Sequence, residues 1–102
     1  MSFDALEWLS DWYASNCNGD WEHEHGVVIE SLDNPGWSVS IDTEDTLFYL
    51  SDRPWEFSEK GPNDWYGYKI INGKFEATGD PLKLEFLINI FKNCLQSRTN
   101  TA

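Results

Sequence analysis

Apolar residues recur at helical spacing between residue 3 and about residue 16. They occupy the i, i+3, i+4 and i+7 positions of an amphipathic helix, namely Ala5, Leu6, Trp8, Leu9, Trp12 and Tyr13. Ser2 is a suitable N-cap residue, and Asn18 with Gly19 offers a left-handed stop. The pattern predicts an N-terminal helix that places Trp8 and Trp12 in the core.

A run of β-branched residues and a strictly alternating run then predict two paired strands. The first covers residues 27–29, and the second places Trp37, Val39 and Ile41 on one face and polar residues on the other. Between them, residues 33–36 read Asp-Asn-Pro-Gly, which is typical of a type II turn whose glycine has a positive φ. We therefore expect a hairpin with one wet face.

The middle of the chain predicts three more strands. Residues 46–50 are strand formers, and residues 65–71 are aromatic and β-branched. Asn72-Gly73 followed by residues 74–78 is a two-residue hairpin signal. Residues 55–64 read instead as a loop whose apolar side chains reach the core. The total is about five strands.

A second helix is predicted near the C-terminus. Asp80 suits the N-cap and Pro81 the first helical position. An apolar stripe follows, made of Leu84, Leu87, Ile88, Phe91 and Leu95. Phe86 and Ile90 flank the stripe, which predicts burial over more than half of the helix circumference. Residues 97–102 are expected to form a frayed tail.

These elements predict a single α+β domain spanning residues 1–102. An N-terminal helix precedes an antiparallel sheet of about five strands built from hairpins, and a C-terminal helix follows it. Both helices are expected to pack on one sheet face, which leaves the other face to solvent or to a partner. No repeat or linker divides the chain.

Charge is the strongest compositional feature, because 18 acidic and 7 basic side chains give a net charge of -11. Such a field disfavours binding to nucleic acid or to a membrane and favours a basic partner. Solubility alone explains an acidic cytosolic protein equally well.

The N-terminus has no basic and apolar leader, so we expect a cytoplasmic protein. In that compartment Cys17 and Cys94 are expected to be reduced thiols in the core.

The densest polar segment is residues 19–26, which contains two histidines among acids. If the segment is extended, His23 and His25 share a face with Trp21, and that face offers no third metal ligand. We interpret the segment as a polar strand edge or a partner contact. The chain also lacks a nucleophile motif and a phosphate-binding loop, so no catalytic residue, metal or cofactor is predicted.

Three tryptophans stand beside acidic residues in the sequence: Trp21, Trp55 and Trp65. An aromatic anchor within an acidic rim is a common composition for an interface hot spot. A place in the core is the competing interpretation for each ring.

An ordered set of fragments resembles the immunity protein 53 family of bacterial polymorphic toxin systems. The fragments are Leu6-Glu7-Trp8-Leu9, Asp11-Trp12-Tyr13, Cys17, Gly19-Asp20-Trp21-Glu22-His23 and Leu32-Asp33-Asn34-Pro35-Gly36-Trp37. The resemblance covers about the first 42 residues, and residues 43–65 diverge from the pattern. It implies a cytoplasmic antidote that protects its producer from a toxin, and the divergent middle is a candidate specificity surface.

We therefore expect a non-enzymatic immunity protein that occludes a basic toxin domain, with a nuclease as the favoured class. The expected contact residues are Asp20, Trp21, Glu22, His23 and Glu24, with Glu44, Asp45 and Asp64 as weaker candidates. Two alternatives remain: a small metal-dependent hydrolase that uses His23 and His25, and an acidic adaptor for another basic protein. The pattern carries no information on oligomeric state.

Overall fold

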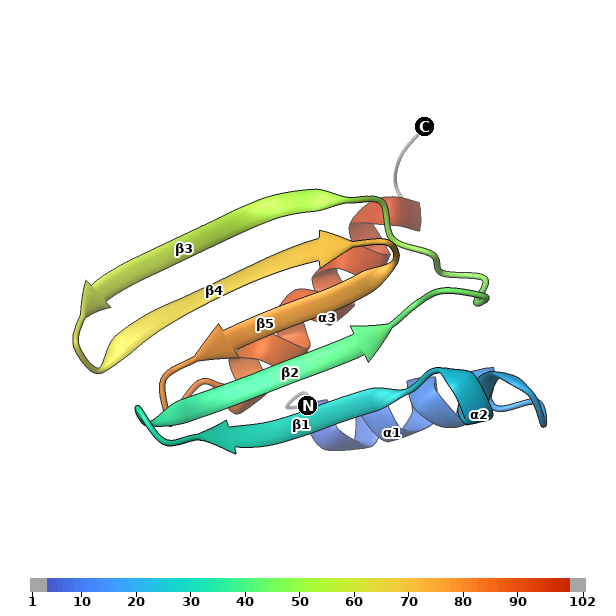
Figure 1. Cartoon of the computed structure of the whole chain (residues 1–102), viewed down its shortest axis with the longest axis horizontal. Coiled ribbons are helices and arrows are strands. Elements are labelled where there is room, and N and C mark those ends of the chain that lie inside the picture. Colours follow the sequence, from blue (N-terminus) through green and yellow to red (C-terminus); the bar gives the residue numbers. More distant parts are fainter. Residues whose placement is uncertain (1–3, 100–102) are drawn as a thin grey trace.

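The computed structural model of the chain describes residues 4–99. Figure 1 shows it as a twisted sheet, seen from the open face, with α1 and α3 behind the sheet. The elements in order are α1 (Ala5–Asn16), α2 (Trp21–Glu24), β1 (Val27–Leu32), β2 (Gly36–Asp42), β3 (Arg53–Gly61), β4 (Asp64–Ile71), β5 (Lys74–Gly79) and α3 (Leu84–Thr99). All neighbouring strands are antiparallel, in the order β1-β2-β5-β4-β3. The predicted α+β class and the five-stranded antiparallel sheet are confirmed.

The core lies between the inner sheet face and the two long helices. Alternation along the three central strands turns five buried side chains toward the helices: Val39, Ile41, Ile70, Phe75 and Ala77. Phe91 of α3 meets them, and its ring centroid is 5.0 Å from that of Trp12 and 5.3 Å from that of Phe75. Trp8 and Trp37 are partly buried against this cluster. The prediction that both helices pack on one face is therefore confirmed.

The first helix begins later than predicted. Asp4 is the N-cap residue, and its side chain accepts a hydrogen bond of 3.0 Å from the backbone N–H of Glu7. A carboxylate at this position satisfies a free N–H group of the first turn and faces the positive end of the helix dipole. The expected cap, Ser2, lies outside the described residues.

The third predicted strand is wrong, because residues 46–50 form turns and residues 53–61 form β3 instead. Thr43 explains the turn: its hydroxyl donates to the carbonyl of Gly73 and accepts from the backbone N–H of Leu50. Such side-chain bonds replace the bonds of a sheet ladder. The loop expected at residues 55–64 is also wrong, because most of it belongs to β3, and Pro54 is compatible with an edge strand.

The two predicted hairpin turns differ in outcome. Asn72 and Gly73 have positive φ values of 52° and 78°, as a tight two-residue turn requires. Gly36 does not have a positive φ, so the expected type II turn is wrong, and the Asn34–Pro35 peptide bond is cis. Gly36 is required for a different reason, since a Cβ atom there would collide with the backbone oxygen of Gly79.

The C-terminal helix begins at Leu84 and not at Pro81. Asp80 is not an N-cap residue but is buried before the helix. Its carboxylate accepts hydrogen bonds from the backbone N–H groups of Trp65 and Leu82 at 3.0 and 2.9 Å. Residues 97–99 are the last residues of the helix, and residues 100–102 of the expected tail lie outside the described part. Phe86 is 41% exposed, so the helix is less enclosed than predicted.

Both cysteines are free thiols, as predicted, although only Cys94 packs against the core and Cys17 is exposed. Burial raises the pKa of the Cys94 thiol. None of the helices in residues 4–99 combines the length and the apolar character needed to span a bilayer.

Candidate functional site

Residues 21–24 of the histidine-containing segment form the short helix α2, and His25 after them is extended. The segment is therefore not one extended strand, which corrects the expectation from the sequence. The carboxylate of Glu22 accepts from the backbone N–H groups of Asn18 and Gly19 at 3.0 and 2.8 Å. The side chain of Asn18 in turn accepts from the N–H groups of Asp20 and Trp21. These local bonds close a tight turn that leads into α2.

Trp21 fastens α2 to the segment that follows β2. Its ring is only 4% exposed and packs edge-on against Trp12, with 6.1 Å between the centroids. Its indole N–H donates 3.0 Å to the backbone carbonyl of Glu44. Trp21 is therefore part of the scaffold of the site, because a buried ring cannot meet a partner directly.

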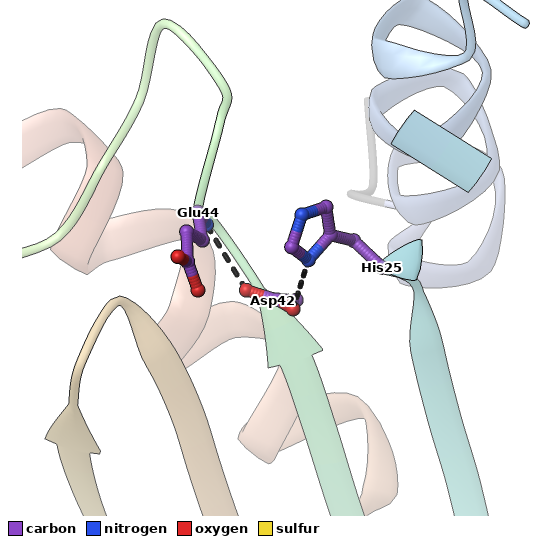
Figure 2. Close-up of side chains that lie close together, drawn as sticks. All are labelled: His25, Asp42 and Glu44. Carbon is purple, nitrogen blue, oxygen red and sulfur yellow. Dashed lines mark hydrogen bonds and ion pairs between the residues drawn. The ribbon is translucent and has the colours of Figure 1, made fainter. Parts of the chain in front are cut away.

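His25 lies between two carboxylates that come from another part of the chain. Its Nδ1 is 2.6 Å from Asp42 Oδ2, and its Nε2 is 3.1 Å from Asp45 Oδ2. Figure 2 shows the His25 ring pointing toward Asp42. An ionised carboxylate accepts hydrogen bonds and cannot donate them. Both ring nitrogens must therefore carry protons to satisfy this geometry. The hydrogen bond with Asp42 raises the pKa of His25; burial opposes this effect, and Asp45 adds to it.

We predict that His25 makes stability fall as the pH rises above the ordinary histidine pKa of about 6.5. Its pKa is higher in the folded state than in the unfolded chain, so its contribution is fully present below the unfolded pKa. The contribution is lost as the pH rises through the folded pKa. Urea unfolding measured from about pH 5.5 to about pH 9 should therefore show a midpoint that falls as the pH rises. This range brackets the ordinary histidine pKa of about 6.5.

The control for this prediction is the second histidine of the same segment. His25→Gln should remove the falling midpoint, whereas His23→Gln, at an exposed position of α2, should retain it. A profile that persists in His25→Gln would assign the pH dependence to another group.

The structure also supplies carboxylates that the sequence did not place beside a histidine. One ligand atom from each of His25, Asp42 and Glu44 lies within 4.8 Å of the others, on the two segments drawn in Figure 2. The expectation that no third ligand lies nearby is therefore wrong for His25. The protonated imidazole already provides a positive charge among these acids, and a metal ion would have to displace its proton.

Six acids gather where α2 meets the end of β2, and we call this surface the acidic end. Its members are Asp20, Glu22, Glu24, Asp42, Glu44 and Asp45. Three of them are exposed and form no hydrogen bond or ion pair through their side chains with the described residues: Asp20, Glu24 and Glu44. His23 is exposed beside them, and Lys74 borders the shallow pocket under the same segment.

The predicted contact residues thus fall into two groups. Seven of them belong to the acidic end or lie beside it, whereas Asp64 lies at the β3–β4 turn, at the opposite end of the sheet in Figure 1. Asp64 forms an ion pair of 2.7 Å with the Nζ of Lys83, which also lies 2.8 Å from Asp80. The sequence did not identify Asp42, although its place at the end of an alternating strand put it on the outer face.

Aromatic side chains form a second surface on the outer face of β3 and β4, and we call it the aromatic platform. Trp55 and Phe57 are 50% and 53% exposed, and their rings stack with 6.3 Å between the centroids. Phe57 lies 6.4 Å from the partly exposed Trp65. Trp55 covers Gly67, where a Cβ atom would collide with the indole ring.

The family model of immunity protein 53 matches residues 6–96 of this chain. The match extends well beyond the 42 residues that carry the resemblance in the sequence, and it includes the acidic end and the aromatic platform. No curated protein and no solved structure matches the chain.

Proposed function

This chain belongs to the immunity protein 53 family, and we propose that it neutralises a cognate toxin by binding and occluding it, without turnover. The family supports an immunity function as such. The toxin class, the contact surface and the cytoplasmic location are our inferences.

The observation that carries the proposal is the acidic end. Six carboxylates from two distant segments are held together there by Trp21 and His25, so the negative surface exists before any partner arrives. A preformed charged surface loses little conformational entropy on binding and speeds the encounter with a basic partner. We assign the contact role to Asp20, Glu22, His23, Glu24, Glu44 and Asp45, with Trp21 as their support.

A nuclease is the toxin class that such a surface suits best. A nuclease binds phosphates in a basic cleft, and an anionic inhibitor competes for that cleft. An interface of standard size would bury roughly 1,600 Å² in total, of which the acidic end would supply the charged part. Because nucleic acid is the target of such a toxin, the inhibitor would act in the cytoplasm.

The decisive experiment is titration of the toxin domain encoded beside this gene with the purified protein. Activity should fall linearly and reach zero at one equivalent, because an occluding inhibitor is consumed by binding. Cells that co-express both proteins should survive, and the pair should elute as one complex.

Two outcomes would contradict the proposal. Full inactivation at a small fraction of one equivalent would indicate catalysis, and retained zinc after dialysis would then favour the hydrolase alternative. An active toxin with a stoichiometric excess of this protein would favour an adaptor for another basic protein.

A further inference from the structure

We propose that the outer face at the β3–β4 turn carries a binding pocket for an arginine side chain of the partner. Phe57, Trp65 and Glu59 line a pocket of about 550 Å³ together with Pro35, Pro62 and Asn63. Only the partner's identity as the toxin rests on the proposed function. The preference for arginine rests on the pocket itself.

The strand register places the charged group of this pocket beside its largest ring. Glu59 pairs directly with Trp65 across β3 and β4, so the two side chains leave the sheet on the same face. Phe57 lies on that face as well, because it is two residues from Glu59 along β3. A carboxylate therefore stands at the edge of an exposed aromatic surface.

The Glu59 carboxylate is available to a partner. Within residues 4–99, no side chain forms a hydrogen bond or an ion pair with it. The neighbouring acid, Asp64, is engaged by Lys83. An exposed carboxylate next to aromatic rings attracts a cation, and the net charge of -11 adds to this attraction.

Ring geometry favours a guanidinium over an ammonium group. Phe57 and Trp65 are tilted by 35° with their centroids 6.4 Å apart, which leaves no room for a group sandwiched between them. A ligand must lie flat on the rings, and a planar guanidinium does so while its N–H groups reach a carboxylate in bidentate fashion. Stacked Trp55 extends this surface along β3.

Two contacts position Trp65 in the pocket. Asp80 accepts from the backbone N–H of Trp65 at 3.0 Å, and the Trp65 ring covers Gly36, where a Cβ atom would lie 3.3 Å from it. An anchored backbone and a ring packed against a neighbouring strand reduce the order that Trp65 must gain when it binds a ligand. The pocket thus combines the features of an aromatic hot spot, at the end of the sheet remote from the acidic end.

The test is a titration of the ¹⁵N-labelled protein with three capped tripeptides that differ only in the central residue, which is arginine, lysine or citrulline. The arginine peptide should shift the indole N–H signals of Trp65 and Trp55 with saturation in the millimolar range. Citrulline keeps the shape of arginine without its charge and should bind at least fivefold more weakly. Equal binding of citrulline, or equal or stronger binding of lysine, would overturn the assignment to arginine.

Glu59→Gln should weaken binding of the arginine peptide at least fivefold, while Glu30→Gln should leave it unchanged. Glu30 is a matched control because it is an exposed carboxylate on the outer face of β1. Unchanged binding by Glu59→Gln, or shifts confined to the acidic end, would disprove the pocket. Since no toxin is present, failure here leaves the inhibition titration unaffected, and failure of that titration leaves the peptide result standing.

Discussion

Truncation of Phe91 to alanine is expected to lower the free energy of unfolding by about 3–5 kcal/mol. Phe91 is fully buried, and its ring contacts those of Trp8, Trp12 and Phe75. The variant loses the burial of a whole ring and leaves a cavity between α1, α3 and the sheet. A domain of this size has a total stability of about 5–15 kcal/mol, so the loss is a large fraction of it.

Urea unfolding followed by tryptophan fluorescence measures this loss, with Phe86→Ala as the matched control on the same helix. Phe86 is 41% exposed, and among residues 4–99 its ring contacts that of Tyr66, so its truncation should cost about 1 kcal/mol. Phe91→Leu should retain most of the stability because it keeps an apolar side chain of similar bulk. Equal losses for the alanine variants of Phe91 and Phe86 would show that the ring cluster is not the centre of the core.

Neutralisation of the acidic end is expected to slow association with the toxin about tenfold at low salt. The variant is Asp20→Asn, Glu24→Gln and Glu44→Gln together, which removes three exposed charges while the hydrogen bonds of Glu22, Asp42 and Asp45 remain. Steering acts on the encounter, so the association rate should fall more than the dissociation rate rises. In about 1 M salt the difference should nearly disappear, because screening shortens the Debye length to about 3 Å.

The control variant changes the net charge by the same amount elsewhere. Glu7→Gln, Asp33→Asn and Glu85→Gln also remove three exposed carboxylates, which lie away from the acidic end. Stopped-flow association at 20 mM and 1 M salt should therefore separate the two triple variants only at low salt. Equal slowing in both would mean that net charge acts without a specific surface, and no slowing in either would remove the acidic end as the steering surface.

The structure also changes which substitutions can locate the contact. Trp21 is buried against Trp12, and Glu22 closes the turn before α2. Alanine at these positions would disturb the fold of the acidic end, so a loss of protection by such variants would not identify contact residues. Exposed acids without internal partners are the cleaner choice.

Local patterns were sufficient for much of the architecture. Three patterns each predicted an element from residues within one short segment. They are the helical spacing in residues 5–16, the alternation in residues 36–42 and the Asn72-Gly73 turn. The C-terminal apolar stripe was identified for the same reason. The predicted start of the helix was wrong, because Asp80 bonds to Trp65 of β4 and not to the first turn of the helix.

Residues 46–50 and 53–61 show where local reasoning stops. The first segment favours a strand, but Thr43 binds the carbonyl of Gly73, 30 residues away, and holds this segment in turns. The second segment reads largely as a loop. The second segment becomes β3 because β4 offers it a free edge. Pairing partners of this kind are distant in sequence, so no short window contains them.

By itself, the sequence determined the fold class, the family and the strongly negative charge, because each follows from composition or from short-range order along the chain. Tertiary structure alone decided that His25 lies between Asp42 and Asp45, that Trp21 is buried, and that Glu59 stands beside Trp65. These contacts join segments that meet only when the sheet and helices pack. A site made of such contacts depends on long-range geometry, which residue spacing does not encode.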